Sequence, residues 1–180
     1  MSRRGWSLFF LSGFVWGIPY LLIRVAVREV DPTIVVFSRV FIGALIFIPI
    51  TLRSGALKQA LPYWKWILFY TVGEMIGPFW LITTAEKHVT SGLAGLLIAT
   101  TPIWSAIQAS IHGDKSVWHH RRLLGMIIGF LGIFLVVGLE SLKGKQSAVA
   151  IAMLILAAMG YSVAMMTISR KAADADGKAI

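Results

Sequence analysis

The sequence lacks cysteine altogether and is poor in charged residues, and each absence excludes a class of protein. With no thiol in its 180 residues, the chain has no disulfide framework and no cysteine-bearing metal site. Charged residues make up only 14% of the chain, whereas soluble domains carry about 25%. Apolar residues reach 57%, above the roughly 45–50% of soluble domains. We therefore exclude a soluble enzyme, a disordered tail and a secreted disulfide-rich scaffold.

The chain has long uncharged runs in place of the missing charge. Six stretches of 17 to 22 residues are almost free of charge: 6–27, 33–52, 66–84, 91–111, 123–139 and 147–168. A helix of about 20 apolar residues crosses a hydrocarbon core about 30 Å thick. The sequence therefore predicts an all-α polytopic membrane helix bundle with six transmembrane helices and the lipid bilayer as a partner.

Positive charges gather between these runs, and they are unequally distributed. A net charge of +9 occurs in nucleic-acid binders, but loop cations in a membrane protein set orientation and contact anionic headgroups, so we expect no nucleic-acid partner. One alternate set of loops holds 11 cations, and the other holds four: Arg28, Lys87, Lys143 and Lys145. The positive-inside rule then predicts that both termini are cytoplasmic. Arg24, near the outer end of the first span, is expected to extend to water.

Helix-breaking and polar residues recur at the centres of three predicted spans. They are Trp16, Gly17 and Pro19 in the first span, the run 73–78 in the third, and Thr101, Pro102 and Trp104 in the fourth. A proline frees a backbone carbonyl that lipid cannot satisfy, so such residues persist beside neighbouring helices or a wet cavity. Secondary transporters build substrate sites from broken helices that meet at the midplane. The alternative is ordinary packing, because proline and glycine are common in membrane helices.

Two charges lie inside the spans. Glu74 is at the centre of the third span, and Arg39 lies about 9 Å below the outer end of the second. A charge at the bilayer centre costs about 2.5–3.5 kcal/mol on insertion scales, so it normally faces a partner or a water-filled cavity. One interpretation is a pathway in which Glu74 titrates and Arg39 binds an anionic substrate group. The other is a structural ion pair that joins the two spans.

Catalytic and metal sites find little support. The sequence contains none of the common hydrolase, phosphate-binding or metalloprotease motifs, and we expect no enzyme activity, no cofactor and no metal. The histidines His112, His119 and His120 fit no standard ligand spacing. A stripe of small residues, Gly125, Gly129 and Gly132, predicts close helix packing, either within the protein or between subunits.

Several of these motifs, in this order and spacing, resemble the first repeat of the EamA family in the drug/metabolite transporter superfamily. They are Trp16-Gly17, Asp31-Pro32, Phe37-Ser38-Arg39, the run from Ala85 to Ala94, Thr101-Pro102 and the run from Gly125 to Gly132. Gly113-Asp114 stands where family members usually carry Gly-Glu, which is a mild departure. The resemblance covers roughly residues 8 to 140.

The resemblance implies ten helices, arranged as two five-helix repeats of opposite topology. Residues 6–140 then form the first repeat, 147–168 the first helix of a second repeat, and 169–180 a polar cytoplasmic tail. We expect the chain to be truncated; the alternative is a natural six-helix protein that completes its pathway as a homodimer. The related small multidrug resistance proteins use an acid in their first helix, and the first span here has none.

The prediction is therefore a secondary transporter of the inner membrane that exports small polar, amino-acid-like metabolites or amphipathic drugs by alternating access. The small-molecule substrate would follow a pathway bordered by Trp16, Pro19, Arg39, Glu74, Thr101, Pro102 and Trp104. The alternative is a channel-like or structural six-helix membrane subunit.

Overall fold

A computed structural model describes residues 3–137 and 147–171 of the chain. Within these ranges the chain is helical and contains no strand. The helices are α1 (Arg3–Ala26), α2 (Pro32–Ser54), α3 (Ala56–Ala60), α4 (Trp64–Tyr70), α5 (Gly77–Ala85), α6 (Ser91–Ile98), α7 (Thr101–Ile111), α8 (His120–Val137) and α9 (Ala148–Lys171). Short 3₁₀ turns at Leu61–Tyr63 and Lys115–Trp118 precede α4 and α8, and a π-helical segment, Thr71–Ile76, joins α4 to α5.

Five segments in the described ranges are long and apolar enough to cross a membrane, which confirms the predicted all-α membrane bundle. They are Gly5–Ala26, Pro32–Ser54, Leu61–Ala85, Ser91–Ile111 and Ala148–Lys171. Helix α8 lies where the fifth span is predicted, but it is not among these five, and its described part of 18 residues ends at Val137. The predicted repeat boundary at residue 140 and the tail residues 172–180 lie outside the described ranges.

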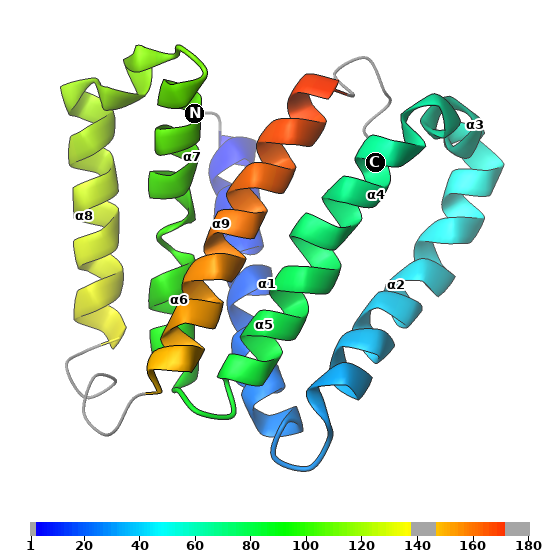
Figure 1. The fold of residues 1–180 in the computed structure, drawn as a ribbon, viewed down its shortest axis with the longest axis horizontal. Helices are drawn as coiled ribbons and strands as arrows, with labels where there is room; N and C mark the ends of the chain where they lie inside the picture. The colour runs from blue at the N-terminus through cyan, green and yellow to red at the C-terminus, as the bar shows by residue number, and fades with distance from the viewer. Residues whose placement is uncertain (1–2, 138–146, 172–180) are drawn as a thin grey trace.

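The long helical segments, α8 included, alternate in direction along the chain, so the start of α1 and the end of α9 lie at the same end of the bundle (Figure 1). Helix α9 crosses the middle of the bundle, with α4 and α5 on one side and α6 and α7 on the other (Figure 1). The family resemblance predicts that this helix starts a second repeat. In the structure it lies at the centre, and helices from earlier in the chain pack around it.

Small residues allow α9 to come this close. Its buried positions are Ala150, Leu154, Ala157, Ala158, Ser162, Ala164 and Ile168. An ideal Cβ placed on Gly160 would lie 3.1 Å from the carbonyl oxygen of Gly73 and 3.4 Å from Cγ of Pro78. Lipid tails are as apolar as the side chains of a membrane helix, so the hydrophobic effect does not drive helices together inside a bilayer. Close contact between backbones is then a main source of helix association. The contact therefore fixes the π-helical segment and the start of α5 against α9.

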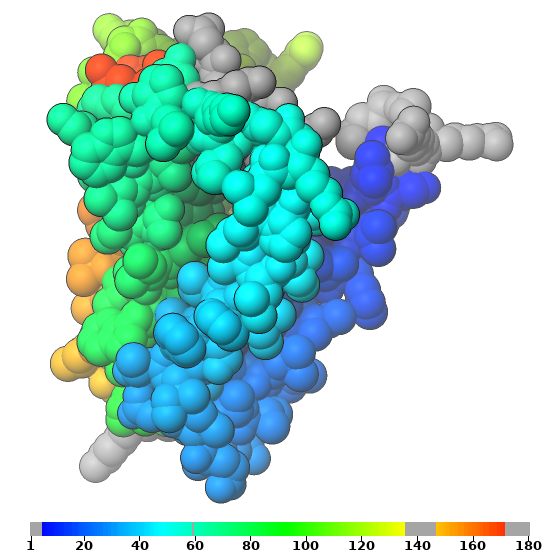
Figure 2. Space-filling model, turned by 90° about the vertical axis from the view of Figure 1, so that its right-hand side faces the viewer, coloured from blue at the N-terminus to red at the C-terminus, as the bar shows by residue number. Residues whose placement is uncertain are grey.

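Helices α1 and α2 are packed far more loosely, and most of their large apolar side chains are exposed. Figure 2 looks onto α2, which lies between α1 on one side and α4 and α5 on the other. Helix α2 begins where the Asp31 carboxylate caps it by accepting a bond of 2.9 Å from the Thr33 amide, and it ends at Gly55, whose φ of 70° suits glycine. The bundle thus has a closed centre and an open side.

The predicted interruptions occur in two of the three spans. The third span contains the π-helical segment just before Pro78, which lacks an amide hydrogen. The fourth span breaks between Ile98 and Thr101, where α7 starts with Pro102 in its first turn. The first span does not break, because α1 continues through Pro19.

Candidate substrate cavity

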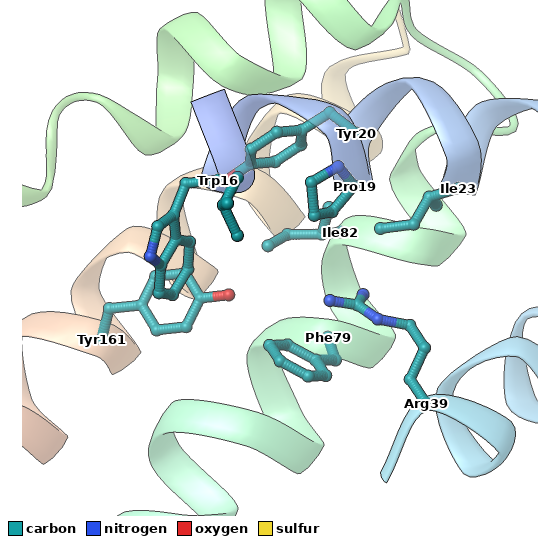
Figure 3. Close-up of a pocket in the computed structure, with 9 residues that line it drawn as sticks. Trp16, Pro19, Tyr20, Ile23, Arg39, Phe79, Ile82 and Tyr161 are labelled. Carbon is teal, nitrogen blue, oxygen red and sulfur yellow. The ribbon is translucent and has the colours of Figure 1, made fainter. Parts of the chain in front are cut away.

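A cavity of about 220 Å³ lies between α1, α2, α5 and α9 on the open side of the bundle (Figure 3). Helix α1 contributes Trp16, Pro19 and Tyr20, and the other helices contribute Arg39, Phe79 and Tyr161. The walls are therefore mainly apolar, with four aromatic side chains and one cationic group. A mainly apolar pocket with a few convergent polar groups is typical of a small-molecule site.

Arg39 is the cationic group of this cavity. Its guanidinium carbon lies 4.1 Å from the centroid of the Phe79 ring, which attracts the cation through the ring's quadrupole. Arg39 donates no hydrogen bond to any residue in the described ranges, although a guanidinium carries five donors. Figure 3 shows its guanidinium and the Tyr161 hydroxyl pointing into the same space. The arrangement can hold a carboxylate or another anionic group.

The structure brings together three of the seven pathway residues predicted from the sequence: Trp16, Pro19 and Arg39. The other four lie elsewhere. Thr101 donates to the Ile98 carbonyl at 2.6 Å, and the Trp104 indole donates to Thr100 at 3.2 Å, so both help to satisfy the break in the fourth span. Pro102 lines a separate groove beside α8.

Glu74 lies in the π-helical segment and forms no ion pair with Arg39. Its Oε2 is buried and has no hydrogen-bond partner among the described residues. Tyr161 is close enough to interact electrostatically with both Glu74 and Arg39. The structural ion pair considered from the sequence is therefore not formed, and a role for Glu74 in the pathway stays a prediction.

The sequence reasoning missed several cavity residues, and helical spacing is the signal that would have found them. Trp16, Pro19, Tyr20 and Ile23 follow one another at helix positions i, i+3, i+4 and i+7, which share one face. Phe79 and Ile82 are likewise three residues apart on α5. Glu86 lies on the same face, one helical turn beyond Ile82.

Glu86 is a further residue that the sequence analysis overlooked, because it directly follows the predicted span and falls in a predicted outer loop. Its side chain is only 1% exposed, and neither carboxylate oxygen has a hydrogen-bond partner within the described residues. Burial raises the pKa of this carboxyl to about 8, while the positive charges of Arg24 and Arg39 act in the opposite direction. The Glu86 carboxyl therefore binds a proton more readily than an exposed glutamate does.

Arg24 does not extend to water, contrary to the expectation from its position near the end of a span. Its Nη1 donates to the backbone carbonyl of Glu86 at 3.2 Å and also to the carbonyl of Val89. The last carbonyls of a helix have no partner within that helix, and the end of α5 lies close to α1. Arg24 therefore binds the backbone carbonyls that follow α5 and forms no hydrogen bond with the Glu86 carboxylate.

The glycine stripe of α8 makes no close contact with another helix in the described part of the chain. An ideal Cβ on Gly125, Gly129 or Gly132 would meet no heavy atom within 4 Å. Gly125 and Gly129 instead line a groove of about 470 Å³ together with Pro102. Packing of this stripe within the described chain is thus not seen, and a contact with another subunit stays a prediction.

Comparison with known proteins identifies the family. Residues 3–138 match the EamA-like transporter family. The chain is 23% identical over 154 residues to the uncharacterized transporter YoaV of Bacillus subtilis, covering 83% of this chain and 52% of that protein. It is 26% identical over 134 residues to the uncharacterized inner membrane transporter YedA of Escherichia coli, covering 73% of this chain and 42% of that protein.

The chain therefore spans about half the length of the curated relatives that it matches. No solved structure matches it significantly. The family match covers well over half of the chain and includes α1, α2, α5 and the other described helices up to α8. This multi-pass membrane protein belongs to the EamA-like transporter family.

Proposed function

We propose that the chain acts as a secondary transporter of the inner membrane that exports small polar, amino-acid-like metabolites or amphipathic drugs by alternating access. The observation that carries this proposal is the cavity of about 220 Å³ in which a half-buried Arg39 has no hydrogen-bond acceptor among the described residues. A guanidinium in these surroundings can bind an anionic group of a ligand.

The size and lining of the cavity favour a small metabolite over a larger drug. Pockets for drug-sized ligands have volumes of about 300–1,000 Å³, so a cavity of about 220 Å³ suits a smaller molecule. The Arg39 guanidinium would bind a carboxylate, while Trp16, Phe79 and Tyr161 would contact the apolar part of the substrate. An amino-acid-like compound has both parts.

Alternating access requires helices that change their shape near the cavity. The π-helical segment Thr71–Ile76 leads directly into α5, which carries Phe79. The break between α6 and α7 offers a second such position. Irregular segments of this kind are frequent at functional sites, and broken helices surround the binding sites of secondary transporters.

Counterflow into proteoliposomes tests the proposal. Vesicles that contain the protein and an unlabelled mixture of the twenty amino acids are diluted into the same mixture carrying a radioactive label. We expect saturable accumulation of label that Arg39→Gln abolishes and that Arg53→Gln, a change at an exposed arginine near the end of the same helix, leaves intact. Flux that does not saturate would favour a channel, and equal counterflow in both variants would contradict the role of Arg39.

The orientation that we propose places both termini in the cytoplasm. A reporter enzyme active only in the cytoplasm should work when it is fused after Arg170 and fail when it is fused after Lys87. The physical reason is the excess of loop cations on the side of the termini. The opposite pattern of reporter activity would reverse the orientation of the cavity in the membrane.

A further inference from the structure

We propose that Glu86 is a proton-binding site whose occupancy is coupled to the binding of an anionic group by Arg39. This inference rests on the proposed function of the cavity and assigns it a coupling group. The carboxylate is almost completely buried, and both of its oxygens lack a hydrogen-bond partner in the part of the chain that the structure describes.

The position of Glu86 connects it to the cavity. Phe79, Ile82 and Glu86 are spaced i, i+3 and i+7 along α5 and its C-terminal end, so they share one face. The first two line the cavity, and Glu86 lies one turn beyond them. Charge interactions link Glu86 to Arg39 on α2 and to Tyr20 on α1, both of which also line the cavity. Glu86 is therefore a buried carboxyl that lies one helical turn beyond the residues that line this pocket.

The neighbouring charges determine which cation Glu86 can take. Arg24 faces it from α1 and Arg39 from α2, but Arg24 donates to backbone carbonyls, and neither guanidinium bonds to the carboxylate. A buried carboxylate without a bonded partner becomes neutral by binding a proton. A metal cation would have to enter surroundings that already contain two positive charges, whereas a proton needs a single oxygen. The ligand of this site is therefore a proton.

The sign of the coupling follows from electrostatics. The positive charge of Arg39 stabilises the ionised form of Glu86 and opposes its protonation. An anionic group bound to Arg39 cancels that charge, so Glu86 takes up a proton when the anion binds. By reciprocity, protonated Glu86 no longer competes as a counter-charge, and Arg39 binds the anion more tightly. Anion and proton thus bind cooperatively.

Infrared spectroscopy of the purified 180-residue chain in lipid nanodiscs tests the proton site. A pH titration follows the carbonyl stretch that only protonated carboxyl groups show. We expect one component with a midpoint of about 8, absent in Glu86→Gln and retained in Glu29→Gln, a change at an exposed acid of the same end. In Arg39→Gln, where Glu86 is intact, the midpoint should rise. No component assignable to Glu86, or an unchanged midpoint in Arg39→Gln, would overturn the inference.

Calorimetry with benzoate, an aromatic carboxylate, tests the coupling. We expect benzoate to raise the midpoint by about one unit in the wild type, and accordingly to bind about tenfold more tightly to the protonated form. Benzoate that binds with the same affinity at all pH values would overturn the coupling and leave the cavity's function standing. No binding at any pH would overturn the function of the cavity together with the coupling. A midpoint that changes when sodium replaces choline would assign Glu86 to a metal cation and contradict the proposal.

Discussion

The two sides of α9 differ in how closely the neighbouring helices pack against them. Toward the π-helical segment and the start of α5, the helix presents Gly160 and Ala164, and the backbones touch. Toward α1 and α2 it presents Tyr161, whose ring borders an open cavity. Neighbouring residues of one helix therefore have different roles. The small side chains allow the helices to pack closely, and the large aromatic side chain lines a cavity that can hold a ligand.

This difference shows where the bundle tolerates change. A closed backbone contact inside a bilayer has no room for an added side chain, because interiors are close-packed. On the open side, a substitution leaves the arrangement of the helices unchanged but removes contacts with the ligand. Substitutions on the closed side should therefore affect stability, and substitutions on the open side should affect binding and transport.

The largest stability effect is expected from Gly160→Leu. The new side chain would meet the Gly73 carbonyl and Pro78 at 3.1 and 3.4 Å, so α9 must shift, and overpacking of this kind costs about 1–3 kcal/mol or more. Thermal unfolding in detergent, followed by size-exclusion chromatography, measures the loss. Gly129→Leu is the matched control, because a Cβ there has no neighbour within 4 Å. Equal loss in both variants would contradict the difference between closed and open positions.

A smaller loss of stability is expected from Ser162→Ala. The buried Ser162 hydroxyl donates to Gln108 Oε1 at 3.1 Å and accepts from Ser105 Oγ at 3.2 Å, which joins α9 to α7. Hydrogen bonds between membrane helices contribute about 0.6 kcal/mol on average and at most about 1.7. We expect a loss of about 1 kcal/mol, measured by the same unfolding assay. Ser169→Ala on the exposed end of α9 should change nothing, and a loss as large as that of Ser162→Ala would remove the argument for this link.

The smallest effect on stability is expected from Glu74→Gln. Because Glu74 forms no ion pair with Arg39, the change leaves no unpaired partner charge behind. The unfolding temperature should therefore stay close to that of the wild type, and Arg39→Gln should bring no compensation in the double variant. A large loss that Arg39→Gln reverses would show that the two residues pair in the membrane.

The sequence was sufficient for the fold class, because hydropathy and length decide which segments cross a bilayer. It also located the irregular third and fourth spans, since Pro78 and Pro102 cannot complete a regular helix. It did not predict the central place of α9, which depends on the fit of small residues against partners far away in the sequence. For the same reason it did not predict the role of Glu86, because the burial of this residue depends on the packing of α1 and α2 near the end of α5.

The cysteine-free sequence allows the most direct test of the cavity as an aqueous substrate pathway. Phe79 and Trp80 are neighbours on α5, but Phe79 lines the cavity, whereas Trp80 does not line it and is 44% exposed on the outside of the bundle. Single cysteines at the two positions are treated with a membrane-impermeant thiol reagent in intact vesicles. We expect fast labelling of Phe79→Cys, slowed by benzoate, and little labelling of Trp80→Cys. Labelling of Trp80→Cys at an equal rate, or an unreactive Phe79→Cys, would contradict this expectation.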